Sequence, residues 1–180
     1  RLRIIKTCQI DTIFDVGANT GQYAQKMRNL GYNKKIISFE PVASAYETLK
    51  ICPSRDKNWM VNLYALGDEN TTGVINISGS SDNSSILDML PKHFEDKPEL
   101  KYVGQQSIEI KTLDAVFDSF VDMNNRVMVK IDTQGYEKNV IDGAINSLAK
   151  IRIIQLEMSI VPLYKNEMLL TEMIRYLEDK

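Results

Sequence analysis

Two patterns of apolar and polar positions alternate along the chain. Short apolar runs rich in Ile, Val and Phe predict buried strands, and stretches in which apolar residues recur every three or four positions predict amphipathic helices. The predicted strands are 12–16, 35–39, 59–66, 127–131 and 151–158. The predicted helices are 20–30, 43–51, 113–120, 137–148 and 167–179. The first helix would turn Tyr23, Met27 and Leu30 to one face and stop at Gly31.

Strands that alternate with helices in this way are typical of a doubly wound, mostly parallel sheet with helices on both faces. The 180 residues are enough for one domain with a buried core. The alternating run 72–78 predicts an antiparallel strand after a turn at 67–70, and 107–111 predicts a further strand. We therefore predict a single Rossmann-like α/β domain, 1–180, with an extra β element.

The stretch 79–106 interrupts the alternation of strands and helices. It begins with a Ser-rich run and continues with Pro91, Pro98 and mixed charges. It is longer than a typical connection, so we predict a lid or a substrate-binding insertion. A disordered surface loop is the alternative for its central part.

The composition narrows the class of protein. Lys plus Arg is 22 and Asp plus Glu is 24, which gives a formal net charge of −2 and no support for a nucleic-acid partner or an electrostatic membrane anchor. No apolar run is long enough to cross a bilayer. Two cysteines and one histidine argue against a disulfide framework and a zinc site, so no metal is expected, and the cysteines fit a reducing cytoplasm.

The loop after the first strand carries the clearest chemistry. The segment 15–21, DVGANTG, joins a strand to a helix, and Gly17 and Gly21 allow a sharp turn and close approach to a ligand. The helix start offers free N–H groups that suit a carboxylate as well as a phosphate. A dinucleotide site needs G-x-G-x-x-G, but Asn19 and Gln22 occupy the second and third glycine positions. A strand-to-helix turn without a ligand is the structural alternative.

Two carboxylates flank this loop. Asp15 precedes the first glycine, where it would repel a phosphate and suit a cationic group such as the amino group of methionine, directly or through water. Glu40 ends the second strand beside Pro41, 19 residues after Gly21, where an acid can accept two hydrogen bonds from a ribose diol. An acid that favours a helix dipole is the alternative for Glu40. The combination predicts S-adenosylmethionine as the cofactor rather than a dinucleotide.

The predicted cofactor site extends beyond these two carboxylates. The run 65–68, ALGD, ends the third strand and offers an apolar wall with polar backbone for an adenine ring, although Gly-Asp is also ordinary turn chemistry. The predicted cofactor-binding residues are Asp15, Gly17, Ala18, Asn19, Gly21, Glu40, Pro41, Leu66, Gly67, Asp68 and Asp132.

Further acids follow later strands. Asp132 ends the strand 127–131, where it could orient or deprotonate a hydroxyl nucleophile, and Glu157 is a second candidate base or a ligand of a sugar hydroxyl. Glu137 has equal claims to function and to helix-dipole stabilisation. Lys130 is expected to pair with one of these acids. His93 lies in the predicted lid without an evident partner, so we do not predict it as the base.

Several motifs together resemble the FkbM-type methyltransferases. They are FDVGANTGQY, SFEP, ALGD, the Ser-rich Asn83-Ser84-Ser85, KTLD, KIDTQGYE and QLE, in that order from residue 10 to about 164. The resemblance implies a class I methyltransferase that uses S-adenosylmethionine and usually acts on a hydroxyl oxygen. It also implies a sugar, a glycolipid or a polyketide-type natural product as acceptor.

Two features depart from that family's pattern. Gln134 stands where many relatives carry Glu, which weakens any argument for a carboxylate metal pair at Asp132. The sequence begins at Arg1 rather than Met and stops at Lys180, where the family normally adds one or two strands, so either the segment is truncated or the sheet is shorter. A methyltransferase-like binding module and an NAD(P)-dependent oxidoreductase remain alternatives, and the acceptor and oligomeric state stay open.

Overall fold

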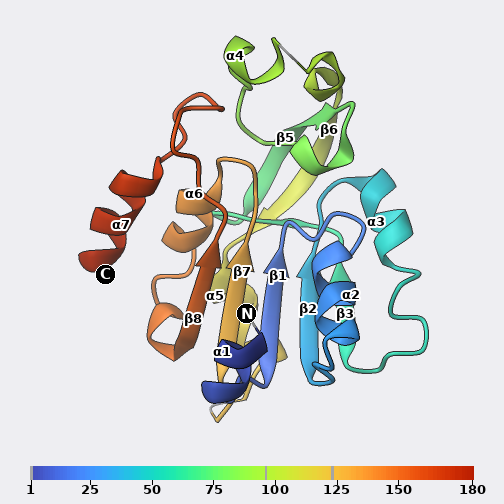
Figure 1. Ribbon diagram of the computed structural model, residues 1–180, viewed down its shortest axis with the longest axis vertical. Coiled ribbons are helices and arrows are strands. Elements are labelled where there is room, and N and C mark those ends of the chain that lie inside the picture. The colour runs from blue at the N-terminus through green and yellow to red at the C-terminus, as the bar shows by residue number, and fades with distance from the viewer. Residues whose placement is uncertain (1, 96, 123) are drawn as a thin grey trace.

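The computed structural model describes residues 2–95, 97–122 and 124–180. Its centre is a five-stranded, all-parallel sheet with the strand order β3-β2-β1-β7-β8 (Figure 1). The strands of this sheet are β1 (Thr12–Val16), β2 (Lys35–Phe39), β3 (Trp59–Asn62), β7 (Val127–Ile131) and β8 (Ile151–Leu156). Strand order reverses between β1 and β7, so the predicted Rossmann-like α/β fold is confirmed.

Helices cover both faces of the central sheet. They are α1 (Leu2–Thr7), α2 (Gln22–Asn29), α3 (Ala43–Leu49), α5 (Leu113–Phe120), α6 (Glu137–Asp142) and α7 (Leu170–Glu178). The short helix α4 (Pro91–Phe94) lies above the sheet and covers neither face (Figure 1). Side chains of β1 alternate between the two faces, as the pleat requires. Ile13 packs with α1, α2 and α3, whereas Phe14 packs with α5, α6 and α7. Residues on both faces are fully buried, which explains the nearly continuous apolar runs of these strands.

A second sheet has the order β4-β6-β5, from β4 (Ala65–Leu66), β5 (Thr71–Ser78) and β6 (Tyr102–Lys111). The predicted single strand 59–66 is therefore wrong, because it divides into β3 in the central sheet and β4 in the second. The chain bends between them at Leu63, which is 45% exposed. The apolar run 59–66 was predicted as one strand because the sequence pattern does not reveal that Leu63 faces solvent. The predicted antiparallel strand exists as β5, and its partner is β6.

Four predicted helices are longer than the observed ones, and α3 is one of them because it ends at Leu49 rather than at residue 51. Helix α2 begins at Gln22 because Gly21 adopts φ +88°, and Leu30 is 45% exposed rather than on the buried face of Met27. Helix α6 ends at Asp142, and Gly143 then packs so closely on the carbonyl of Gly67 that a Cβ atom would lie 1.9 Å from that oxygen. A separate 3₁₀ turn, Leu148–Lys150, follows before β8, and α7 begins at Leu170 rather than at residue 167.

The segment between β5 and β6 lies at the upper end of Figure 1. It contains the 3₁₀ turns Ser81–Asn83 and Pro98–Leu100 and the short helix α4. Because β6 begins at Tyr102, the last part of the predicted insertion 79–106 is strand instead. Met89 and Leu100 form a small apolar cluster with Tyr164, a residue that follows β8. The segment is thereby fixed to the loop after the last strand.

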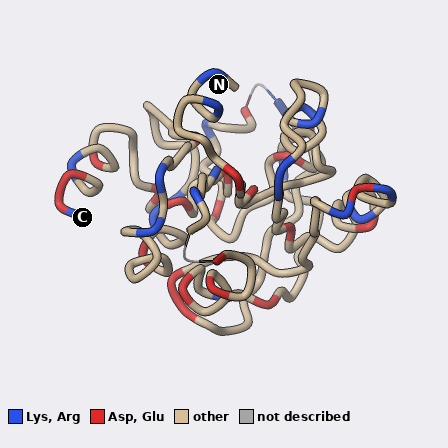
Figure 2. Tube along the Cα trace, turned by 90° about the horizontal axis from the view of Figure 1, so that it is seen from below, with Lys and Arg blue, Asp and Glu red and all other residues tan. Residues whose placement is uncertain are grey.

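Positively and negatively charged residues are interspersed along the chain, as the coloured trace seen from below shows (Figure 2). Among the described helices, none is long and apolar enough to cross a membrane.

Candidate active site

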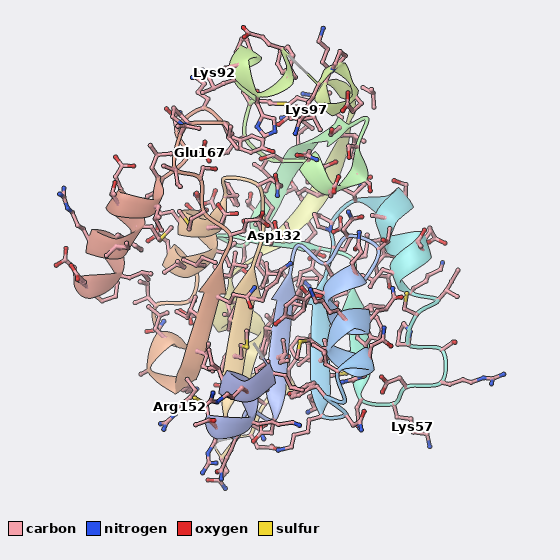
Figure 3. The ribbon with its side chains drawn as sticks, viewed as in Figure 1. Lys57, Lys92, Lys97, Asp132, Arg152 and Glu167 are labelled. Carbon is pink, nitrogen blue, oxygen red and sulfur yellow. The ribbon has the colours of Figure 1, made fainter. Side chains whose placement is uncertain are left out.

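A cavity of about 470 Å³ opens at the carboxyl ends of the central strands. This is the edge where doubly wound sheets bind ligands, beside the reversal of strand order. Figure 3 places Asp132 at this end of the sheet, below the segment that carries Lys92 and Lys97, and places Arg152 at the opposite end. The predicted site residues that line the cavity are Gly17, Ala18, Asn19, Glu40, Pro41, Leu66, Asp132 and Glu157.

The glycine loop is shaped by close contact with the neighbouring strand end. Gly17 adopts φ +71°, and a Cβ atom there would lie 1.8 Å from the carbonyl oxygen of Asp132. Its N–H donates to the carbonyl of Phe39 at 3.1 Å. Only glycine therefore allows the loop after β1 to fit between the ends of β2 and β7. Gly21 lies outside the cavity lining, where a Cβ atom would lie 3.2 Å from the ring of Trp59.

Glu40 joins the end of β2 to the glycine loop. Its Oε2 accepts the backbone N–H of Asn19 at 2.7 Å, and its Oε1 accepts that of Val42 at 2.8 Å. The residue is only 5% exposed, and burial raises its pKa to about 7 despite these two hydrogen bonds. Each oxygen keeps a free lone pair, so this acid can still accept hydrogen bonds from a ligand in the cavity.

Asp15 is fully buried and does not line the cavity. Its Oδ1 lies 3.2 Å from Nζ of Lys130, and its Oδ2 accepts a hydrogen bond from Ser38 at 3.4 Å. Ser38 in turn accepts the indole N–H of Trp59 at 3.0 Å. Lys130 thus already pairs with the charge of Asp15 inside the protein. Asp15 lies beneath the glycine loop, with which it was predicted to bind the same ligand.

Lys130 connects this buried acid to the cavity. Its Nζ lies 3.4 Å from Oδ2 of Asp132 and donates to the carbonyl of Gly17 at 3.1 Å. Burial opposes the charge on Lys130, but Asp15 and Asp132 outweigh that effect and raise its pKa. The predicted pairing of this lysine is confirmed, and it involves two acids rather than one. Lys130 also lines the cavity, a role that its strand position alone did not reveal.

Asp132 and Glu157 form a pair of carboxyl groups across the ends of β7 and β8. Glu157 forms a side-chain hydrogen bond with Asp132, and this bond and the charge of Asp132 raise the pKa of Glu157 to about 7. The Oδ1 atom of Asp132 also accepts the side-chain amide of Gln134 at 3.0 Å. Two acids with a shared environment and one raised pKa are typical of sites that move a proton.

Of the remaining predicted site residues, some line the cavity and others support residues that line it. Leu66 is buried in the cavity wall, whereas Gly67 and Asp68 lie outside the lining. Asp68 accepts the hydroxyl of Tyr136 at 3.2 Å, and Tyr136 lines the cavity. Glu137 accepts the backbone N–H groups of Thr133 and Gly135, at 2.8 and 3.3 Å, which favours a role in shaping this loop.

The segment after β5 forms one wall of the cavity. The sequence predicted a lid or insertion there but not which of its residues face the cavity. Its cavity-lining residues are Ser81, Asp82, Ser84 and Ile86. Asn19 of the glycine loop donates its side-chain amide to Ser81 Oγ at 3.3 Å, so this wall touches the loop directly. The serine-rich composition was the sequence feature that could have identified these lining residues. His93 does not line the cavity, and its ring packs at 5.4 Å from that of Tyr164.

Across residues 2–95, 97–122 and 124–180, no cluster of three or more His, Cys, Asp or Glu side chains is arranged to hold a metal ion.

A comparison with protein families found a match. The family model described as methyltransferase FkbM domain matches residues 15–180, from the acid before the glycine loop to the end of the sequence. No curated protein and no solved structure matches.

Proposed function

The chain belongs to the FkbM methyltransferase family, and from this premise we propose that it transfers the methyl group of S-adenosylmethionine to a hydroxyl group. The acceptor that we propose is a sugar, a glycolipid or a polyketide-type natural product. One observation carries the proposal: the glycine loop, the ribose-type acid Glu40 and the carboxyl pair of Asp132 and Glu157 line the same cavity.

The residues of the cavity fit S-adenosylmethionine. A volume of about 470 Å³ lies within the range of roughly 300–1,000 Å³ typical of ligand sites. Glu40 would accept the ribose hydroxyls, and Leu66 would form part of the adenine wall. Oδ1 of Asn19 is buried and has no hydrogen-bond partner among the described residues, so it is an acceptor suited to the methionine ammonium group.

The proposed cofactor supplies an already activated methyl group, so the protein's main task is to position the reactants. The pair of Asp132 and Glu157 takes the proton of the acceptor hydroxyl, since a base with a pKa near the working pH is the most effective. Ser81 and its neighbours after β5 would cover the acceptor as a lid. The two free cysteines, Cys8 and Cys52, support a cytoplasmic setting.

The cofactor is tested first, by calorimetry and thermal shift on the purified chain. S-adenosylmethionine and S-adenosylhomocysteine should each bind and raise the melting temperature, whereas NADH and NADPH should not. Stabilisation by a nicotinamide cofactor alone would favour the oxidoreductase. Absence of binding by all four compounds would favour a non-catalytic module.

The acceptor is tested with S-adenosylmethionine labelled in its methyl group. Sugars, glycolipids and hydroxylated polyketides are offered separately, and label transfer and S-adenosylhomocysteine formation are measured together. We expect a methyl ether product with one of these classes. Transfer only to an amine would overturn the assignment to a hydroxyl acceptor while leaving the cofactor assignment intact.

A further inference from the structure

The two carboxyl groups at the cavity differ in their surroundings. Both oxygens of Asp132 face donors, because Oδ1 accepts the amide of Gln134 at 3.0 Å and Oδ2 lies 3.4 Å from Nζ of Lys130. The charged groups that face Glu157 are Asp132, Lys130 and Glu137. Asp132 thus has a donor at each oxygen, whereas two of the three charged groups around Glu157 are acids. These surroundings stabilise Asp132, rather than Glu157, as the anion.

The orientation of Gln134 is set from its other end. The hydroxyl of Tyr164 donates to Oε1 of Gln134 at 2.8 Å, which leaves the NH₂ group directed at Asp132. A carboxylate anion can only accept hydrogen bonds, so this orientation matches an ionised Asp132. Hydrogen bonds to the charged form of an acid stabilise that form.

We propose that Gln134, oriented by Tyr164, is a positioning residue that keeps Asp132 ionised and leaves Glu157 as the group that takes and releases the proton. This inference rests on the proposed function only for its role in methyl transfer. The hydrogen-bond arrangement itself does not depend on the identity of any ligand.

The position of Gln134 is fixed by the backbone as well as by its side chain. Gln134 adopts φ +55°, and its carbonyl accepts the hydroxyl of Ser85 at 2.6 Å. Tyr164 is 2% exposed and is packed against Met89 and Leu100 of the segment after β5. A residue in the left-handed region persists only where its surroundings hold it, so the amide is presented to Asp132 by a rigid frame.

The proton step follows from this division of roles. Glu157, ionised beside the Asp132 anion, accepts the proton of the acceptor hydroxyl. S-adenosylmethionine, when bound, would supply the methyl group: the acceptor oxygen would bond to the methyl carbon as the carbon–sulfur bond breaks, with the electron pair of that bond left on sulfur. Glu157 is exposed, so it can then release the proton to water. Its pKa of about 7 supports this exchange near neutral pH.

The arrangement can be tested by titration without any ligand. Carboxyl groups are labelled with ¹³C, and the glutamate signals are followed by NMR as a function of pH. Glu40 also has a pKa of about 7, so the signal of Glu157 is identified by its loss in Glu157→Gln. In the unaltered protein we expect Glu157 to titrate in a single step near pH 7.

Two variants remove the positioning contact. Gln134→Met keeps the size of the side chain but loses the amide, and Tyr164→Phe removes only the hydroxyl that orients it. In both, the proton should be shared between Asp132 and Glu157, so that the Glu157 signal titrates in two steps. Tyr102→Phe is the control, because that hydroxyl donates to the carbonyl of Leu87 in the same apolar cluster and does not contact Gln134.

A two-step Glu157 signal in Gln134→Met and Tyr164→Phe, with a single step in Tyr102→Phe, would support the assignment. A single unchanged step in both variants would overturn it. If Gln134→Met fails to fold by circular dichroism, the smaller change Tyr164→Phe carries the test. Failure of S-adenosylmethionine to bind would instead reject the proposed function and leave this assignment standing, so the two failures can be told apart.

Discussion

Glu40 accepts the backbone N–H of Asn19 at 2.7 Å and thereby ties the end of β2 to the glycine loop. The same acid faces the cavity with its remaining lone pairs. One carboxyl group thus shapes the loop and is offered to the ligand, so its removal has consequences for both.

Glu40→Ala should weaken binding of S-adenosylmethionine by at least about tenfold, because the hydrogen bonds to the ribose diol and the support of the loop are lost together. Isothermal titration calorimetry measures this directly. Glu47→Ala is the matched control, since that acid lies on the exposed surface of α3. Unchanged affinity in Glu40→Ala would contradict the ribose role.

Asp132→Asn should lower turnover by about a hundredfold or more while changing cofactor affinity only a few-fold, because the charge that makes Glu157 basic is lost. Steady-state kinetics with an identified acceptor and calorimetry with the cofactor give the two quantities. Asp118→Asn, near the opposite end of the sheet in pairing with Lys150, should change neither. Equal losses of turnover and of cofactor affinity in Asp132→Asn would contradict a role of Asp132 in the chemical step.

The stability of the ligand-free protein should fall as pH rises from about 4.5 to about 7. The pKa of Glu40 is raised from 4.5 to about 7 by burial, so in this window the folded state binds more protons than the unfolded state. The stabilisation present below pH 4.5 is therefore lost as pH passes through 7, on the order of 3 kcal/mol for this buried group. Glu157 contributes with the same sign.

Urea unfolding at several pH values measures this dependence. Glu40→Gln should flatten the decline, because the altered side chain no longer titrates. A decline of the same steepness in Glu40→Gln would show that other groups cause it.

Gly17→Ala should destabilise the fold by more than about 4 kcal/mol, since its Cβ would collide with the carbonyl oxygen of Asp132 at 1.8 Å. Gly31→Ala is the matched control. Gly31 also has a positive φ, +89°, but nothing lies within 4 Å of its Cβ position, so only the cost of the left-handed conformation, about 1 kcal/mol, remains. Denaturant unfolding compares the two, and similar losses would argue against crowding at Gly17.

The central sheet could be predicted from the sequence because its strands are buried on both faces. The runs 12–16, 35–39 and 127–131 carry an uninterrupted apolar signal with clear ends, and β1, β2 and β7 have these bounds. The division of 59–66 could not be predicted, since the bend near Leu63 depends on β4 pairing with β6 about 45 residues later. Long-range pairing of that kind leaves no local pattern.

Site residues at the ends of strands could be predicted from the sequence. Roles that depend on contacts between distant segments could not. The position of Glu40 at the end of β2 already placed it beside the glycine loop. The burial of Asp15 under Lys130 depends on parallel pairing of β1 with β7, 115 residues apart. The ion pair between these two residues could therefore not be predicted from the sequence. The link from Tyr164 through Gln134 to Asp132 joins three separate segments and likewise required the structure.

Trp59 is the single tryptophan of the chain, and its indole is hydrogen-bonded through Ser38 toward the buried Asp15 and packs beside Gly21 of the loop. The molecule therefore carries its own fluorophore next to the candidate cofactor site. A ligand that reorders the loop would change the emission of one known residue, without a label and without a second tryptophan to obscure it.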